Sequence, residues 1–382
     1  MKIVFDGRTI RPGRTGVGFF VERLLRALMT NDRQNEYLVL LNDESVWAKC
    51  EVPANFRGLR VRADYESHPW GDLWERFFLP KLLEREQADL FHGPAYRVPH
   101  TRCRCPTIVT IYDLTCWRCA SDYRWPFRCY MRWLIRRSCK SADGIIATSK
   151  AAANDLRDLL GVVESKVQVI YGAADERFHR AESVDRQRLI SIHPALAGPY
   201  ILTVGTIEPR KRIDLLVTAY EKARAKGSLP HSLIVVGKVG WKPESGLSAM
   251  RQSPATSSIH HLGYVGEDDL VTIYQGADLF VCASRCEGFG LPPLEAMACG
   301  MPVVVTAGGA LAETVGDAGV VVEPAGAQAL ADAVLAILKS EDRRRSLSEK
   351  ALDRASQFSW KTAADQTIAL YERILKSGTV HP

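Results

Sequence analysis

Several features that define other classes of protein are missing from this sequence. Its 382 residues contain no run of about eighteen apolar residues, the length that spans a bilayer, and no charged and then apolar signal peptide at the start. The formal net charge of +6 is small and gives no indication of nucleic-acid binding. We therefore expect a cytoplasmic globular protein without a nucleic-acid partner.

The ten cysteines do not follow the pattern of a disulfide framework or of a zinc site. They lie in a long chain without an export signal, and most of them flank apolar or aromatic residues, so we expect reduced thiols. Cys103-x-Cys105 and Cys116-x-x-Cys119 match no standard zinc spacing closely. We predict neither a metal site nor a bound cofactor.

Short apolar segments alternate with amphipathic ones along the whole chain, which predicts parallel sheets covered by helices on both faces. In the first half we expect strands at residues 1–6, 37–41, 88–92, 107–111, 144–149 and 167–170. A polar stretch at residues 175–198 interrupts the pattern. It then restarts with expected strands at residues 200–205, 232–237, 259–262, 277–282, 301–305 and 319–322.

This order predicts an α/β protein of two doubly wound, Rossmann-like domains that face each other across a cleft. We place the first domain at residues 1–180 and the second at residues 181–359, with a final helix at residues 360–382 that can cross back to the first domain. A nicotinamide-dependent dehydrogenase is a poor alternative, because the first loop lacks the G-x-G-x-x-G spacing and no acid follows at the expected distance.

The loop before the helix expected at residues 292–299 has the residues of a phosphate or sugar site. Pro292 and Pro293 suit a first helical turn, and Gly300 suits the position just after the helix. Gly288 and Gly290 allow the backbone to come close to a ligand, and helix starts attract phosphate. The sequence therefore predicts a cradle for a diphosphate or a sugar.

Two carboxylates flank this loop. Because they would repel a neighbouring diphosphate, their presence has to be explained. Glu287 and Glu295 can accept hydrogen bonds from paired hydroxyls at two ends of an elongated ligand such as a nucleotide sugar. In the alternative interpretation, Glu295 complements the helix dipole and Glu287 is a solvated loop residue, each worth less than about 1 kcal/mol. The residues alone leave both interpretations open.

The segment SRCEGFGLPPLEAMACGMPVV at residues 284–304 closely resembles the E-x7-E region of glycosyltransferase family 4, retaining enzymes of the GT-B fold. The resemblance extends over nearly the whole chain and is stronger in the second half. It implies that Glu295 holds the ribose hydroxyls and that Glu287 contacts the donor sugar. It also implies that the sugar and phosphate pocket is lined by Gly288, Phe289, Gly290 and Leu291.

A basic pair follows the first expected strand of the second domain. Arg210 and Lys211 lie in an E-P-R-K segment that resembles the same family, which implies that they bind the donor phosphates and stabilise the departing diphosphate. The alternative is a basic surface turn. The family often has another arginine where this chain has Thr206, so the division of labour between the two cations stays open.

The resemblance also implies contacts for residues at the ends of other expected strands. Gly16, in the loop at residues 13–18, corresponds to a glycine-rich loop that approaches the donor phosphates. Gly237, Tyr264 and Val265 correspond to the pocket for the nucleobase, although a turn-forming glycine is an alternative at such positions.

Residues 108–114 align with a family segment that commonly reads T-I-H-D-L, in which the histidine touches the donor sugar near its sixth carbon. This chain has Tyr112 instead, which cannot titrate near neutral pH. We infer a different preference at that carbon, such as a deoxy sugar. Asp113 is expected to order the loop rather than attack the sugar. His92 resembles a family position that faces the cleft, which implies contact with the acceptor.

Residues 117–140 combine seven Arg or Lys residues with six aromatic residues and a single acid, Asp122. This composition suits an anionic membrane surface, and the alternative is a solvated basic helix with a buried aromatic face. In the family the region often meets membrane-bound acceptors. We therefore expect a peripheral enzyme on the cytoplasmic face of the inner membrane that acts on a lipid-linked saccharide.

The resemblance implies a retaining hexosyltransferase, with mannose from GDP-mannose as the first choice, in polysaccharide or lipopolysaccharide biosynthesis. A UDP-sugar or GDP-6-deoxyhexose donor and a non-catalytic protein that binds nucleotide sugars are the alternatives. A nucleotide-sugar 2-epimerase would need acid and base residues around the sugar, and no convincing set is present. The oligomeric state and the linkage formed stay open.

Overall fold

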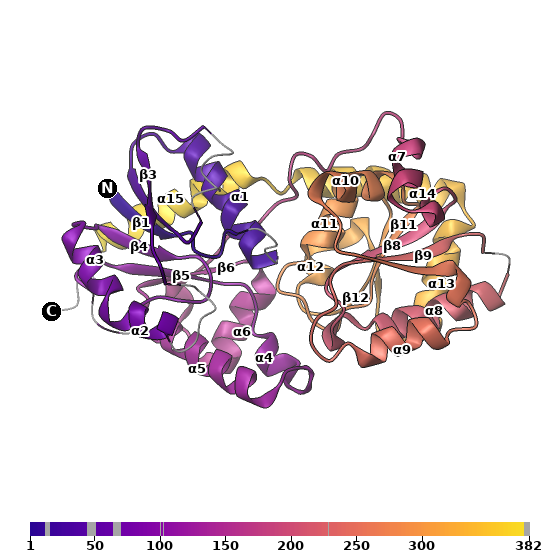
Figure 1. The fold of residues 1–382 in the computed structure, drawn as a ribbon, viewed down its shortest axis with the longest axis horizontal. Helices are drawn as coiled ribbons and strands as arrows, with labels where there is room; N and C mark the ends of the chain where they lie inside the picture. The colour runs from indigo at the N-terminus through magenta and orange to yellow at the C-terminus, as the bar shows by residue number, and fades with distance from the viewer. Residues whose placement is uncertain are drawn as a thin grey trace. The chain divides into compact units, whose positions relative to one another are not determined.

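The computed structural model describes residues 1–11, 16–43, 51–63, 70–99, 101, 103–227 and 229–377. The chain forms two compact units (Figure 1). The first unit comprises Met1–Trp117, Arg124–Gly172 and Ser359–Pro382, and the second comprises Arg118–Tyr123 and Ala173–Phe358. The main chain therefore leaves the first unit after Gly172 and returns to it at Ser359.

The first unit is built on a seven-stranded parallel sheet in the order β3-β2-β1-β4-β5-β6-β7. Its five inner strands are buried on both faces almost throughout, which explains why they read as continuous apolar runs rather than as alternating patterns. The strands are β1 (Lys2–Asp6), β2 (Glu36–Leu41), β3 (Phe56–Arg60), β4 (Leu90–Gly93), β5 (Thr107–Ile111), β6 (Gly144–Ala147) and β7 (Val167–Val169).

Helices cover both faces of this sheet. They are α1 (Gly16–Asn31), α2 (Trp70–Phe77), α3 (Leu79–Arg85), α4 (Thr115–Arg118), α5 (Trp125–Ser141), α6 (Lys150–Leu160) and α15 (Trp360–Lys376). The C-terminal helix α15 lies beside α1 in Figure 1, where it is yellow. Its side chains Leu370 and Tyr371 are buried in the same core as Leu24 and Leu28 of α1. A distant segment of the sequence thus completes the core of the first unit.

The second unit has a six-stranded parallel sheet in the order β10-β9-β8-β11-β12-β13. Its strands are β8 (Tyr200–Val204), β9 (Ser232–Val236), β10 (Ile259–Gly263), β11 (Leu279–Cys282), β12 (Val303–Thr306) and β13 (Val320–Val322). Side chains of β9 alternate between two cores, with Leu233 and Val235 on one face and Ile234 and Val236 on the other. The strand order reverses between β8 and β11, and ligands of such sheets bind beyond the carboxyl ends of the strands at this point.

The helices of the second unit are α7 (Arg186–Ile192), α8 (Ile213–Ala225), α9 (Glu244–Gln252), α10 (Glu267–Gly276), α11 (Leu291–Ala298), α12 (Leu311–Val315), α13 (Ala327–Leu338) and α14 (Glu341–Ser356). No helix in the described ranges is both long and apolar enough to cross a bilayer. The expectation of two Rossmann-like α/β domains with parallel sheets is confirmed. The edge strand β3 was not expected, because its sequence FRGLR is half polar.

Candidate active site

Three charged residues meet where the sheet of the second unit reverses its order. Arg210 and Lys211 lie in the loop after β8, and Glu287 lies in the loop after β11. Arg210 Nη1 is 2.7 Å from Glu287 Oε2, and Lys211 Nζ is 2.6 Å from Oε1 of the same carboxylate. The side chains are 19%, 10% and 11% exposed, respectively. The structure therefore brings together the two basic residues and the acid that the sequence singled out separately.

A second carboxylate extends this cluster. Glu208 Oε1 is 2.5 Å from Arg210 Nε, and its side chain is only 1% exposed. The Arg210 guanidinium also donates to the Cys286 carbonyl at 3.2 Å, and the Arg210 carbonyl accepts from the Arg285 amide at 2.7 Å. These bonds join the two loops through both side chains and main chain. Sequence reasoning missed Glu208 as a partner, because nothing in the spacing shows which face of the loop it occupies.

The two carboxylates respond differently to this environment. Burial alone would raise the pKa of Glu287, but Arg210 and Lys211 outweigh it and lower this pKa to about 2. Burial raises the pKa of Glu208 above its ordinary value, in spite of the opposing charge of Arg210. Glu287 is therefore anionic at neutral pH and can only accept hydrogen bonds, which excludes it as a proton donor.

The loop after Glu287 has the expected turn and helix start. Gly290 has φ of 99°, a conformation that favours glycine, and α11 begins at the next residue, Leu291. The Phe289 carbonyl accepts a short hydrogen bond from the Thr314 hydroxyl of α12, which fixes the loop from the other side. Because Pro292 and Pro293 carry no N–H, Leu291 supplies the only amide among the first three helical positions. A ligand at this helix start would depend on loop amides more than on the helix itself.

Glu295 lies on α11 and has a buried partner on α10. The Tyr274 hydroxyl lies 3.0 Å from Glu295 Oε2 and 3.3 Å from the carbonyl of Pro292, and both of these groups are acceptors. Burial, reinforced by the charge of Glu295, raises the pKa of Tyr274 well above its ordinary value, so the hydroxyl keeps its proton and acts as the donor. Tyr274 thus orients the carboxylate, a role that nothing in the local sequence indicates.

Glycines allow the loops of this edge to approach one another. Gly205 and Gly237 have φ of 153° and 143°, and a Cβ atom on Gly237 would lie 2.1 Å from the Gly205 carbonyl oxygen. Thr206 follows Gly205 and is half-buried, and its methyl group would be 2.5 Å from a Cβ on Gly240. Gly237 therefore has a structural reason to be glycine, and its contact with a nucleobase stays a prediction.

Sequence reasoning also missed the pair of glycines after β12. A Cβ atom on Gly309 would lie 2.3 Å from the Glu287 carbonyl oxygen, and one on Gly308 would lie 2.3 Å from that of Ser284. Ala310 donates its amide to the Glu287 carbonyl at 2.9 Å. This close contact holds the backbone of Glu287 in place. The available signal was the Gly-Gly step directly after an expected strand.

The remaining second-unit candidates lie at the ends of β9 and β10. Tyr264 is 53% exposed, and Lys238 Nζ lies 4.7 Å from the centre of its ring. Val265 is half-buried beside them in sequence. An exposed ring with a cation on its face is a suitable surface for stacking a planar base. Its use for this purpose stays a prediction.

Tyr112 and Asp113 follow β5 in the first unit. The Tyr112 hydroxyl donates to the Pro94 carbonyl at 2.7 Å, and its side chain is 8% exposed. Its ring lies at right angles to the Phe20 ring, with 5.1 Å between the ring centroids. Asp113 Oδ1 accepts hydrogen bonds from the Thr115 amide at 3.0 Å and the Thr115 hydroxyl at 2.6 Å. The Asp113 carboxylate thus orders the start of α4.

His92 has a structural role in the first unit that differs from the expected acceptor contact. Its ring is fully buried, with Nδ1 2.6 Å from the Tyr371 hydroxyl and Nε2 2.9 Å from Thr110 Oγ1. Burial lowers the pKa of His92 to about 3, so the ring is neutral. Both nitrogens are used in joining β4 and β5 to α15, and contact with an acceptor would require these bonds to break.

Gly16 begins α1 and is exposed, with no atom within 4 Å of a Cβ placed on it. The preceding loop positions Gly13, Arg14 and Thr15 lie outside the described residues. Residues 125–140 of the basic and aromatic segment lie in α5, on which Trp125, Phe127 and Trp133 are 68%, 49% and 47% exposed. These three rings therefore do not form a buried aromatic face.

Two family models match the chain, one in each half. Residues 14–178 match the model described as Glycosyltransferase Family 4, and residues 186–354 match the model described as Glycosyl transferases group 1. The cluster of Glu287, Arg210 and Lys211 spans the loops of the second match. Both family descriptions name the same class of enzyme.

Individual relatives agree with these models. The O-antigen chain mannosyltransferase B of Escherichia coli is 29% identical over 389 residues, covering 97% of this chain and 100% of the relative. The serotype-specific mannosyltransferase WbdA of Escherichia coli is 29% identical over 290 residues, covering 74% of this chain and 35% of that protein, so this chain spans about a third of it. Sucrose-phosphate synthase from Thermosynechococcus elongatus has the same fold, with a TM-score of 0.75, 22% identity and coverage of 99% and 100%.

Proposed function

We propose that this chain, a glycosyltransferase with the two Rossmann-like domains of the GT-B fold, transfers mannose from GDP-mannose to a lipid-linked saccharide. The observation that carries the transferase chemistry is the contact of Glu287 with both Arg210 and Lys211 at the switch point of the second sheet. The choice of mannose rests on the two similar mannosyltransferases. A role in the synthesis of a lipopolysaccharide-type polymer follows from the same relatives.

The three charged residues have distinct parts in this proposal. Glu287 accepts hydrogen bonds from hydroxyls of the donor sugar and so positions its anomeric carbon. Arg210 and Lys211 lie where negative charge grows on the departing diphosphate, and fixed cations at such a point lower the barrier because they need no reorganisation. The loop Gly288, Phe289, Gly290 and Leu291 supplies main-chain contacts to the sugar and phosphates.

The nucleoside is held by the neighbouring elements. Glu295, oriented by Tyr274, accepts hydrogen bonds from the ribose hydroxyls. Gly237, Tyr264 and Val265 contact the base, and Thr206 lies beside the phosphates. Mutation of Glu295 should therefore weaken nucleotide binding, whereas mutation of Glu287 should reduce turnover.

We infer retention of the anomeric configuration by front-face displacement. The bond from the anomeric carbon to the phosphate oxygen breaks, and a bond to the acceptor oxygen forms on the same face. The acceptor proton moves to the departing phosphate oxygen. Glu287 is bound by two cations and is therefore a poor nucleophile, which supports front-face displacement over a covalent glycosyl-enzyme intermediate. Within the first unit, Asp113 keeps the turn that follows Tyr112 in place.

The acceptor side of the proposal includes an anionic membrane. Three exposed aromatic side chains on α5, Trp125, Phe127 and Trp133, share this helix with five Arg or Lys residues. Such a surface binds anionic lipid headgroups through its cations and inserts its rings at the interface. Flotation with vesicles that contain anionic lipid tests this part, and equal recovery with neutral vesicles would contradict it.

The donor is tested by thermal shift against a panel of GDP- and UDP-sugars, followed by transfer assays with the donors that bind. A donor at a hundred times its dissociation constant should stabilise the protein by about 2.7 kcal/mol. GDP-mannose should bind and be consumed, and NMR of the product should show the donor's anomeric configuration. If only a UDP-sugar or a GDP-6-deoxyhexose stabilises the protein, that sugar nucleotide and not GDP-mannose is the donor. Binding without turnover would favour the non-catalytic alternative.

The sugar preference at the sixth carbon has its own test. Tyr112→His should shift the relative turnover of GDP-mannose and a GDP-6-deoxyhexose. Because the Tyr112 hydroxyl is bonded to the Pro94 carbonyl, Tyr112→Phe is the control for loss of that bond alone. An unchanged preference in both variants would remove this residue from the specificity site.

A further inference from the structure

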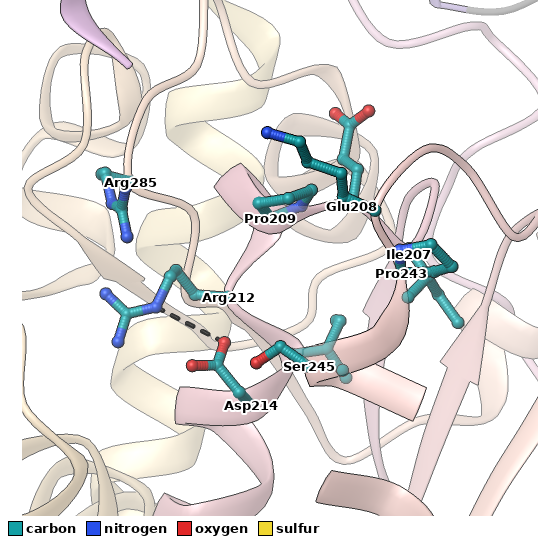
Figure 2. Close-up of a pocket in the computed structure, with 11 residues that line it drawn as sticks. Ile207, Glu208, Pro209, Arg212, Asp214, Pro243, Ser245 and Arg285 are labelled. Carbon is teal, nitrogen blue, oxygen red and sulfur yellow. Dashed lines mark ion pairs between the residues drawn. The ribbon is translucent and has the colours of Figure 1, made fainter. Parts of the chain in front are cut away.

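A pocket of about 110 Å³ lies in the second unit next to the charged cluster (Figure 2). It is large enough for several water molecules, and therefore for a group of the size of a phosphate. Glu208 and Pro209 line one side, so the pocket and the candidate active site share the loop after β8. The proposed donor contacts do not include the other lining residues.

Three basic residues line this pocket: Arg212, Lys242 and Arg285. Figure 2 shows Arg212 and Arg285 on the same side, with their guanidinium groups near the open space between them. Like charges that gather around one cavity repel each other, and an anion between them relieves this repulsion. The Ser245 hydroxyl, also in the lining, adds a donor.

Two of these cations also have an unfavourable backbone conformation. Arg212 has φ of 51° and Lys242 has φ of 48°, in the left-handed region where glycine or asparagine is favoured. Only four non-glycine residues in the described part of the chain have positive φ, and two of them line this pocket. Non-glycine residues held in such conformations cluster at active sites and ligand clamps.

The acids near the pocket neutralise only part of this charge. Asp214 Oδ1 is 3.4 Å from Arg212 Nε, and Asp122 Oδ1 is 2.9 Å from Arg285 Nη1. The Glu208 carboxylate is paired with Arg210. In Figure 2 it points away from Arg212 and Arg285.

Lys242 differs from the two arginines, because its Nζ donates to the carbonyls of Ser121 at 3.0 Å and Tyr123 at 3.4 Å. Across the described residues it forms no ion pair with a carboxylate. The pocket therefore keeps an excess of positive charge.

We propose that this pocket binds a phosphate or diphosphate group, at a subsite separate from the donor diphosphate. Arg212, Lys242 and Arg285 are the cationic ligands, and the N-terminal turns of α8 and α9 border the same space. A phosphate or diphosphate group at this subsite can come from two kinds of ligand. One is the diphosphate that links a saccharide acceptor to its lipid, and the other is free phosphate or pyrophosphate. The site itself does not depend on the choice of donor sugar.

Calorimetric titration of the full chain with inorganic phosphate, pyrophosphate and a short-chain isoprenyl diphosphate tests the subsite. Saturating GDP and UDP are present throughout, so that the donor site is filled. We expect saturable binding that is weakened about tenfold or more in Arg212→Asn and in Lys242→Asn, since each loses a charged hydrogen bond. Asparagine tolerates the left-handed conformation, so both variants should fold.

Arg251→Gln is the matched control, because Arg251 is exposed at the other end of α9, away from the pocket. It should bind the anions like the unaltered protein. Tighter binding of the isoprenyl diphosphate than of pyrophosphate would identify the acceptor as the source, and equal binding would identify the free anion. The absence of saturable binding, or equal binding by all variants, would overturn the subsite. Because no sugar donor is used, a wrong donor assignment would not change this result.

Discussion

Each unit contains a cluster of charged side chains, but the two clusters differ in burial. In the first unit, Arg8 pairs with Asp6 at 2.7 Å and with Glu75 at 2.8 Å, and Glu75 also pairs with Arg97 at 3.1 Å. These four side chains are at most 3% exposed. In the second unit, Arg210, Lys211 and Glu287 are 10% to 19% exposed and lie on loops.

The difference agrees with a structural role for the first cluster and with the ligand-binding role proposed for the second. Burial alone would lower the pKa of Arg8, but Asp6 and Glu75 outweigh it and raise this pKa above its ordinary value, so the charge is kept inside the first unit. Breaking a fully buried pair leaves an uncompensated charge and costs stability. In a partly exposed cluster, by contrast, a charged side chain can leave its partner within the protein and bind a substrate. We therefore expect mutations in the two clusters to affect different measurements.

The largest effect on stability is expected in the first cluster. Glu75→Ala should destabilise the first unit by about 3–5 kcal/mol, because Arg8 and Arg97 both lose a buried partner. Glu84→Ala on α3 is the control, since its pair with Arg104 is 52% and 84% exposed and should be worth at most about 1 kcal/mol. Hydrogen exchange at residues 70–99 measures both variants. Equal protection in the two variants would contradict a structural role for the buried network.

Lys211→Met should affect turnover instead. Loss of a fixed cation at the departing diphosphate should lower kcat by about 10²–10³-fold. The unfolding free energy should change much less than in Glu75→Ala. Lys226→Met is the control, because Lys226 is an exposed lysine of the same unit, paired with Asp332 at 2.7 Å. A stability loss in Lys211→Met that accounts for the lost activity would remove the distinction between the clusters.

Acidification should weaken the first unit through His92. Its pKa is about 3 in the folded protein and rises to the ordinary value of about 6.5 on unfolding, so the unfolded chain binds the proton between these values. The stability of the first unit is therefore unaffected by His92 titration above pH 6.5. Below pH 6.5 its free energy of unfolding falls by up to about 1.4 kcal/mol per pH unit. Denaturant unfolding at several pH values should show this slope, and His92→Gln should flatten it. An unchanged slope would assign the acid sensitivity to other groups.

The smallest effect is expected at the partner of Glu295. Tyr274→Phe should weaken nucleoside diphosphate binding by about 0.5–1.5 kcal/mol, with kcat nearly unchanged, because the carboxylate loses its orienting donor. Tyr200→Phe removes a buried hydroxyl that donates to the Ile273 carbonyl at 2.6 Å on the same helix, without touching Glu295. It should reduce stability but not affinity. Titration calorimetry separates the two, and an affinity loss in both would point to movement of α10.

The sequence predicted the elements well where the physical signal is local. The strand expected at residues 107–111 coincides with β5, and the helix expected near Pro292 begins at Leu291 and is followed by Gly300 with φ of 72°. Apolar runs, prolines and glycines specify such features within a few residues. The half-polar edge strand β3 lacks that signal and was missed.

The contacts of the site depend on residues far apart in the chain. Tyr274 lies 21 positions from Glu295, and Tyr371 lies 279 positions from His92. No local pattern relates such pairs, because the order of the strands decides which loops meet. Resemblance to a family predicted roles for Glu287, Arg210 and Lys211. It did not reveal Glu208, Gly308 or Gly309, which contact them.

The return of α15 to the first unit has a consequence for the order of folding during synthesis. The first unit cannot bury Leu370 and Tyr371 until α15 has left the ribosome, whereas every segment of the second unit precedes α15 and has by then been made. Domains generally fold as units while the chain is being made. The second unit should thus reach its native state first, and the first unit should mature only after translation of α15 is complete.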